Sequence, residues 1–331
     1  MKNVLFATTA IVAASFAGTA FADISLSGAG ELGITYNEAN DEDINDGFDF
    51  VQDFKVDITA TGTSDSGLTF GGTAEIDSAT NEPGDASNSF DDVSTFVSGS
   101  FGTLSLGAID SAYDFVSVGI ATGGLDDEAD YYFSDAGGDG VNDNTIARYD
   151  YVFGSVTFSV SVEQGVVFGA EDDLEISNVG VVAEGDLDGV EADDIISVGL
   201  GYSGDLGGFE LDAGLGYQMH SIGDTDIDII GLSVGTGFGA VGVNLFYEII
   251  DIDGVDDDLE TIAASIDYTA GALTIGANYV NNSFGDDDVD SYGLFTEYDL
   301  GGGLSAVAAV SQQDIGDESN VRAGFGLAMA F

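Results

Sequence analysis

The stretch DISLSGAGELGITY, residues 23–36, alternates between two kinds of side chain along its whole length. Apolar residues or glycines occupy the even positions from Ile24 to Tyr36, and polar or small residues occupy the odd positions. Because successive side chains of a β-strand point to opposite faces, this period of two predicts a strand with one apolar face. A second strand is predicted in FDFVQDFKVDITA, residues 48–60, by the same period.

The alternation recurs down the chain and predicts about sixteen strands. Further segments of this kind are VTFSVSVE (156–163), FELDAGLGYQM (209–219), VGVNLFYEI (241–249), LTIGANY (273–279), SYGLFTEY (291–298) and LSAVAAV (304–310). Short glycine-rich joins such as TAGA and LGGG suit tight hairpin turns, and long joins such as NEANDEDIND are acidic. Hairpin follows hairpin, so we expect an all-β, antiparallel, up-and-down sheet in a single domain, residues 23–331.

The composition combines extreme charge with ample apolar surface. Of 331 residues, 61 are acidic and 4 are basic, for a formal charge of −57, yet 44% are hydrophobic. A disordered chain of this charge would be far less hydrophobic, so we expect a folded protein. No cysteine is present, which excludes disulfides and thiol catalysis. The one histidine, His220, is expected on the surface at a loop edge, so no hydrolase site is supported and no enzyme is predicted.

The first 22 residues predict a signal peptide. A positive start with Lys2 is followed by the apolar stretch VLFATTAIVAASFAGTA, and Ala20-Phe21-Ala22 fits a small-x-small cleavage site before Asp23. A transmembrane anchor is the alternative, but threonine, serine and glycine dilute the apolar stretch. Removing residues 1–22 leaves three basic residues, Lys55, Arg148 and Arg322.

Two architectures could bury the apolar faces of these strands. A soluble β-sandwich packs them against each other, whereas a closed transmembrane β-barrel turns them toward lipid and surrounds water with its polar faces. Tyrosines near the predicted strand ends favour the barrel, because an amphipathic ring suits a membrane interface. These are Tyr36, Tyr149, Tyr151, Tyr202, Tyr217, Tyr247, Tyr268, Tyr279, Tyr292 and Tyr298. The apolar faces are also nearly free of charge, as lipid contact requires.

Four segments together resemble the general diffusion porins of Gram-negative bacteria, especially the sixteen-stranded group of alphaproteobacteria. They are ADISLSGAGELGITYNE (22–38), TSDSGLTFGGTAEI (63–76), VSGSFGTLSLGA (97–108) and the terminal VRAGFGLAMAF (321–331). The similarity spans residues 23–331. It implies a passive outer-membrane channel for small hydrophilic solutes and ions, surrounded by outer-membrane lipid and lipopolysaccharide, and a homotrimer. It also implies that the terminal Phe331 is the signal read by the outer-membrane assembly machinery.

The longest connection runs from Asp110 to about Ala147, and a loop of this length inside a compact fold is expected to be functional. In the porins that this chain resembles, the third loop folds into the barrel and its carboxylates narrow the opening. The matching acidic residues are Asp110, Asp114, Asp126, Asp127, Glu128 and Asp130. Alternatively, some of them lie in solvent on the outer surface.

Alternation assigns the three remaining basic residues and several acidic ones to the polar, lumen-facing side. These predicted pore-wall residues are Lys55, Arg148, Arg322, Glu31, Asp53, Asp57, Glu75 and Asp77. Acidic residues outnumber basic ones, and rings of Asp and Glu favour cations, so we expect a cation-selective channel. Alternatively, the three basic residues lie on the polar side only because charges avoid lipid, and they have no role in the pore.

No cofactor or specific metal site is predicted. DEDINDG, residues 41–47, lacks the glycine and glutamate of a calcium-binding EF-hand, although loose binding of Ca²⁺ or Mg²⁺ by acidic loops is expected. Nucleic acid is excluded as a partner, because phosphate would be repelled. The alternative function is an outer-membrane adhesin or structural barrel with divalent-cation-binding acidic loops.

Overall fold

The computed structural model describes residues 23–38, 47–77, 90–125, 144–167, 189–285, 287–316 and 318–331, so residues 1–22 lie outside it. The first long strands are β1 (Asp23–Asn37), β2 (Phe48–Thr63), β3 (Thr69–Asp77), β4 (Phe90–Gly99), β5 (Gly102–Gly107), β6 (Ile146–Phe153) and β7 (Val156–Glu163). The others are β10 (Ile195–Asp205), β11 (Glu210–Ile222), β12 (Thr225–Phe238), β13 (Val241–Ile252), β14 (Leu259–Ala270), β15 (Leu273–Phe284), β16 (Asp287–Gly301), β17 (Leu304–Ile315) and β18 (Glu318–Ala330). The helix α1 (Ala112–Val116) and two short strands, β8 (Val166–Val167) and β9 (Glu191–Ala192), complete the described elements.

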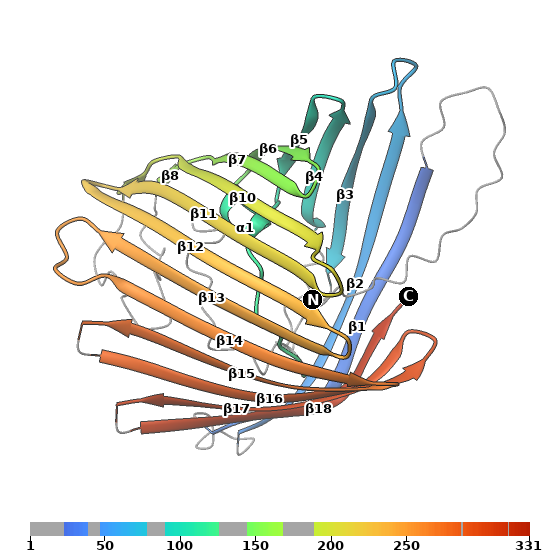
Figure 1. Cartoon of the computed structure of the whole chain (residues 1–331), viewed down its shortest axis with the longest axis vertical. Coiled ribbons are helices and arrows are strands. Elements are labelled where there is room, and N and C mark those ends of the chain that lie inside the picture. Colours follow the sequence, from blue (N-terminus) through green and yellow to red (C-terminus); the bar gives the residue numbers. More distant parts are fainter. Residues whose placement is uncertain are drawn as a thin grey trace.

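The sixteen long strands form one closed antiparallel barrel (Figure 1). Each pairs with its neighbours in chain order, and β7 pairs directly with β10. The ends of the chain complete the ring, since β1 pairs with both β2 and β18, with Ala29 opposite Ala330 and Asn37 opposite Arg322. The predicted all-β barrel of about sixteen strands is therefore confirmed.

The connections differ between the two ends of the barrel. At one end, here called the short-turn end, neighbouring strands are joined by turns such as 154–155, 206–209 and 271–272. Gly271 allows the last of these to be tight, because its φ of 66° lies in the left-handed region. At the opposite loop end, the connections before β10 are long, but 223–224 joins β11 to β12 in two residues. The predicted alternation of long and short joins therefore holds in the first half of the barrel and weakens in the second.

The outward faces of the strands are apolar over most of the barrel. Large exposed side chains include Leu26, Phe50 and Phe325. Toward the loop end, outward tyrosines donate hydrogen bonds to carboxylates on neighbouring strands: Tyr247 to Glu260 at 2.9 Å and Tyr279 to Asp290 at 2.7 Å. A tyrosine whose ring lies beside apolar side chains and whose hydroxyl contacts a carboxylate is suited to the boundary between hydrocarbon and water.

At the loop end of β12 to β14 the polarity of the two faces is reversed. Ile227, Ile229 and Ile250 point inward and are buried with Tyr113, whereas Asp228 and Glu260 are exposed on the outside. The expectation that the carboxylate side always surrounds the lumen is wrong here. Beyond the hydrocarbon zone an outward carboxylate meets water or headgroups, and the inward isoleucines are free to pack against a segment inside the barrel.

Candidate functional site

A segment from the long β5–β6 connection lies against the inner face of the barrel, and we call its described residues 110–125 the strap. It begins with α1, whose first turn is capped by the Ser111 hydroxyl, which accepts the Asp114 N–H at 3.2 Å. The helix packs on β7, β10 and β11 (Figure 1). No helix of the described residues is long and apolar enough to cross a membrane.

Three buried serines of the wall accept backbone N–H groups of the strap. Ser161 on β7 accepts from Ala112 at 2.8 Å, Ser233 on β12 from Val118 at 2.8 Å and Ser265 on β14 from Ala121 at 2.7 Å. The Asn278 side chain on β15 donates to the Ala121 carbonyl at 3.3 Å. A segment without its own strand or long helix has backbone N–H and C=O groups that need hydrogen-bond partners elsewhere, and here the side chains of the wall provide those partners. These bonds fix the strap along the wall from β7 to β15.

Two glycines of the wall make room for Tyr113 of α1. A Cβ built at Gly216 or Gly231 would overlap the Tyr113 ring or hydroxyl. The hydroxyl donates a hydrogen bond of 2.5 Å to the Glu248 carboxylate on β13, and both side chains are completely buried. The buried Tyr113 hydroxyl therefore has an acceptor in a site closed to solvent.

The far end of the strap reaches the strands that close the barrel. Leu125 is completely buried and lies so close to Gly33 on β1 and Gly326 on β18 that a Cβ at either would overlap it. Phe295 on β16 packs beside Gly123. The strap thus follows the inner wall from β7 past β16 to β1.

Arg148 on β6, one of the predicted pore-wall residues, fastens the start of the strap. Its Nε lies 3.2 Å from Asp150 Oδ2, and its Nη1 donates to the Asp110 carbonyl at 2.5 Å. The guanidinium also lies 3.7 Å from the centre of the Phe115 ring. The side chain is buried, and Asp150 in turn accepts from Ser159 at 2.6 Å. Its positive charge is therefore matched by Asp150.

Replacing Arg148 tests this anchoring. Arg148→Lys keeps the charge but cannot contact Asp150, the Asp110 carbonyl and the Phe115 ring together. We expect the free energy of unfolding to fall by about 1–2 kcal/mol, the scale of a hydrogen bond to a charged group. Urea denaturation of the refolded barrel measures it. Phe115→Leu, alone and combined with Arg148→Lys, should reveal coupling between the two side chains, and purely additive losses would contradict the stacking contact.

The predicted acidic residues of β1 to β3 gather on one inner surface with Lys55. Glu31 lies opposite Asp53, and Asp57 lies opposite Glu75. Lys55 Nζ is 3.7 Å from Glu75 Oε2. We call Glu31, Asp53, Asp57 and Glu75 the acidic wall. Asp77 is opposite Lys55 in the strand register, and its side chain lies outside the described residues.

The other predicted residues are spread along the chain. Arg322 lies on β18 opposite Asn37 and is half-buried. Of the strap acids, Asp110 is exposed and Asp114 is half-buried in α1. The rest lie outside the described residues: Asp126, Asp127, Glu128 and Asp130.

Phe331 ends the chain beside the first strand. Its backbone N–H donates to the Gly28 carbonyl at 2.8 Å, and the Gly28 N–H donates back at 3.3 Å. Its ring lies 6.2 Å from that of Phe54, edge to face. The last residue thus extends the pairing that closes the barrel.

The expectation for His220 is wrong. The side chain is only 7% exposed and lies on the inner side of β11, opposite Ile227 of β12. It belongs to the region where apolar side chains point inward, so alternation counted from the middle of the strand would have placed it correctly. The described residues contain no group of three or more His, Asp or Glu side chains that could hold a metal ion.

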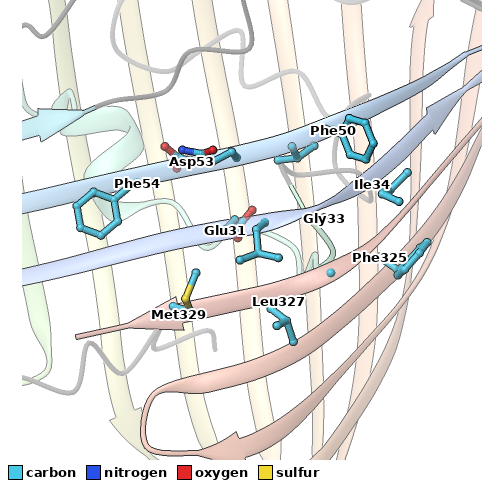
Figure 2. Close-up of a pocket in the computed structure, with 13 residues that line it drawn as sticks. Glu31, Gly33, Ile34, Phe50, Asp53, Phe54, Phe325, Leu327 and Met329 are labelled. Atoms are coloured by element: carbon cyan, nitrogen blue, oxygen red, sulfur yellow. The ribbon is translucent and has the colours of Figure 1, made fainter. Parts of the chain in front are cut away.

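Two hollows adjoin these surfaces. A groove of about 880 Å³ lies where β1, β2 and β18 meet. Figure 2 shows Phe54, Phe325 and Met329 among its apolar side chains. The second, of about 570 Å³, lies between the strap and the strands β7, β10, β11 and β13.

Comparison with known proteins gives a consistent result. The family model described as Gram-negative porin matches residues 7–318. A porin of Rhodobacter capsulatus is 29% identical over 340 residues, covering 93% of this chain and all of that protein. A porin structure refined at 1.8 Å superposes with a TM-score of 0.68 at 24% identity, covering 93% of this chain and all of the other. An anion-selective porin from Comamonas acidovorans gives a TM-score of 0.67 at 16% identity, over 94% of this chain and all of the other.

Proposed function

Because this chain belongs to the Gram-negative porin family, a family of outer-membrane channels rather than enzymes, we propose that it passes small hydrophilic solutes and ions passively, with a preference for cations. The observation that supports a passage is the position of the strap. It is bound to the inner wall by Ser161 on β7, Ser233 on β12 and Ser265 on β14, whereas the acidic wall stands on β1 to β3. Water and ions can occupy the space between them.

The preference for cations rests on side chains and not on the fold, since an anion-selective porin has the same fold. Arg148 is ion-paired with Asp150, and Lys55 lies beside Glu75 within the acidic wall. The inner surface of β1 to β3 therefore has an excess of carboxylates. Negative side chains around a narrow aqueous path raise the local concentration of cations. The strap carboxylates, including Asp126, Asp127, Glu128 and Asp130, are proposed to add to this field at the constriction.

A planar-bilayer recording tests the proposal. The purified protein should produce large stepwise increases in K⁺ conductance, and a KCl gradient should give a reversal potential of cation-selective sign. An anion-selective sign would reject the charge argument while leaving the channel. A complete lack of conductance would favour the adhesin or structural barrel, in which acidic loops bind Ca²⁺ or Mg²⁺ loosely.

The same proposal includes export and assembly. Residues 1–22 would be removed as a signal peptide, so N-terminal sequencing of the membrane protein should begin at Asp23. A homotrimer within lipid and lipopolysaccharide is proposed from the family resemblance, with the apolar groove of β1, β2 and β18 as a contact face. Chemical cross-linking in intact outer membranes should then give species of up to three subunits.

Phe331 has a structural role that can be separated from a role in assembly. Phe331→Ala removes the edge-to-face contact with Phe54, so the refolded barrel should lose about 1 kcal/mol of unfolding free energy in urea. If the assembly machinery also reads this ring, the amount of barrel in cell outer membranes should fall far more than this small loss explains. Equal amounts of variant and wild type in membranes would reject the assembly signal. Phe54→Leu is the matched control, because it removes the same ring contact and leaves the terminus intact.

A further inference from the structure

The pocket of about 570 Å³ lies beneath the strap near the short-turn end of the barrel. Its roof is formed by residues 115–120 of the strap. Thr157 follows the 154–155 turn, and Ser203 and Asp212 flank the 206–209 turn. A pocket of this volume lies within the range of ligand-binding sites, and a small solute would share it with water.

Hydrogen-bond acceptors without partners line this pocket. The Asn244 side chain is 2% exposed, and among the described residues its Oδ1 has no hydrogen-bond partner. Its amide nitrogen donates to Ser265 Oγ at 3.3 Å, which orients the group. The Asp212 carboxylate likewise makes no hydrogen bond or ion pair within the part of the chain that the structure describes. A buried carbonyl oxygen without a donor is costly, so a ligand that brings donors would stabilise it.

The charge of the lining selects the kind of donor. No lysine or arginine is among the described lining residues. Arg148 stacks on Phe115, which also lines the pocket, but its charge is matched by Asp150. The hydroxyls of Ser117, Thr157 and Ser203 add further acceptors. Val116, Val118 and Ile120 supply an apolar side that suits a short alkyl chain.

We propose that the pocket beneath the strap is a binding site for small primary ammonium ions, which Asp212 and Asn244 hold by their N–H donors. A primary ammonium has three donors and one positive charge, which match a carboxylate, an amide oxygen and neighbouring hydroxyls. This inference rests on the proposed channel function in one respect only: the bound ammonium ions would be a class of solute that also passes through the channel. The binding itself requires no conductance.

Saturation-transfer NMR on the detergent-solubilised barrel tests the binding, with n-butylammonium chloride as the probe. The expected result is saturable binding of n-butylammonium and at least fivefold weaker binding of tetramethylammonium, which has equal charge but no N–H donor. Asp212→Asn should weaken n-butylammonium binding about tenfold, the loss expected for one hydrogen bond to a charged group. Asn244→Leu, which removes the amide oxygen at similar volume, should weaken it about threefold.

Asp267→Asn is the matched control, because Asp267 also faces inward near the short-turn end, opposite Gly242, and does not line the pocket. It should change the binding less than twofold. Equal losses in Asp212→Asn and Asp267→Asn would overturn the site, since they would reflect only the overall charge of the lumen. Equal binding of tetramethylammonium would also overturn it. Conductance without n-butylammonium binding refutes the site alone, whereas binding without conductance supports the site and refutes the channel.

Discussion

We expect a Gly231→Leu barrel to conduct less than half the K⁺ current of the wild type in single-channel recordings. A side chain at Gly231 would occupy the position of the Tyr113 hydroxyl, and Gly231 lies directly opposite Glu248 in the strand register. The strap would have to leave the wall, and the direction open to it is inward, into the conducting space. Overpacking of this kind typically costs about 1–3 kcal/mol, which the strap can avoid by moving.

The barrel itself should survive this substitution, because its strand pairing does not involve the strap. The strand content measured by circular dichroism should therefore stay close to that of the wild type, whereas the thermal midpoint should fall with the loss of the strap contacts. Gly201→Ala is the matched control: Gly201 also lies beneath α1, but a Cβ there would meet Val116 at 3.5 Å, an ordinary contact. A normal current in Gly231→Leu would show that the strap does not limit the conducting space.

The second large effect is expected from neutralising the acidic wall. The substitutions Glu31→Gln, Asp53→Asn, Asp57→Asn and Glu75→Gln, made together, should lower the ratio of K⁺ to Cl⁻ permeability about tenfold at physiological salt. The screening length at physiological salt is about 8 Å, so the field of one carboxylate is weak across the opening and the four act together. At about 1 M salt, where the screening length is roughly 3 Å, the wild type should lose most of its preference.

The control is a set of four carboxylates on the outer surface. Asn or Gln at Asp228, Glu260, Asp290 and Asp314 removes the same charge from strands β12, β14, β16 and β17. Reversal potentials of this variant should remain near the wild-type value. Equal changes in both variants would show that total charge, and not the inner wall, sets the ion preference.

The alternation in residues 23–36 is sufficient to predict β1 and its faces, because lipid on one side and water on the other impose opposite requirements on neighbouring residues. The placement of Lys55, Glu75 and Arg148 on the inner side follows from the same counting. The inward direction of Ile227 and Ile229 does not follow from their apolar character, which in most strands of this barrel marks the outward side. Counting from Ser233, on the same side of β12, places both inside.

The contacts of the strap could not be predicted from the sequence. Ser161, Ser233 and Ser265 become acceptors only when residues 49 to 144 positions away are brought to them, and serine is common on any lumen-facing strand. Glu248 is one of 61 acidic residues, and its burial against Tyr113 depends on the space left by two glycines. The available signal is a set of glycines and serines on the inner side, near the middle of β10 to β12: Ser197, Gly199, Gly201, Gly214, Gly216, Gly231, Ser233 and Gly235.

The joining of β1 to β18 has a consequence for biogenesis. The first strand to be synthesised, β1, gains its second neighbour only when the last strand, β18, has been made. Asn37 then lies opposite Arg322, which is 285 positions away in the sequence. Until that moment, two rows of amide and carbonyl groups remain unsatisfied, which hydrocarbon does not tolerate. A translation product that stops short of residue 318 would therefore leave the barrel open between β1 and β17. Insertion should succeed only as an all-or-none event in which both unpaired strand edges are sheltered from lipid.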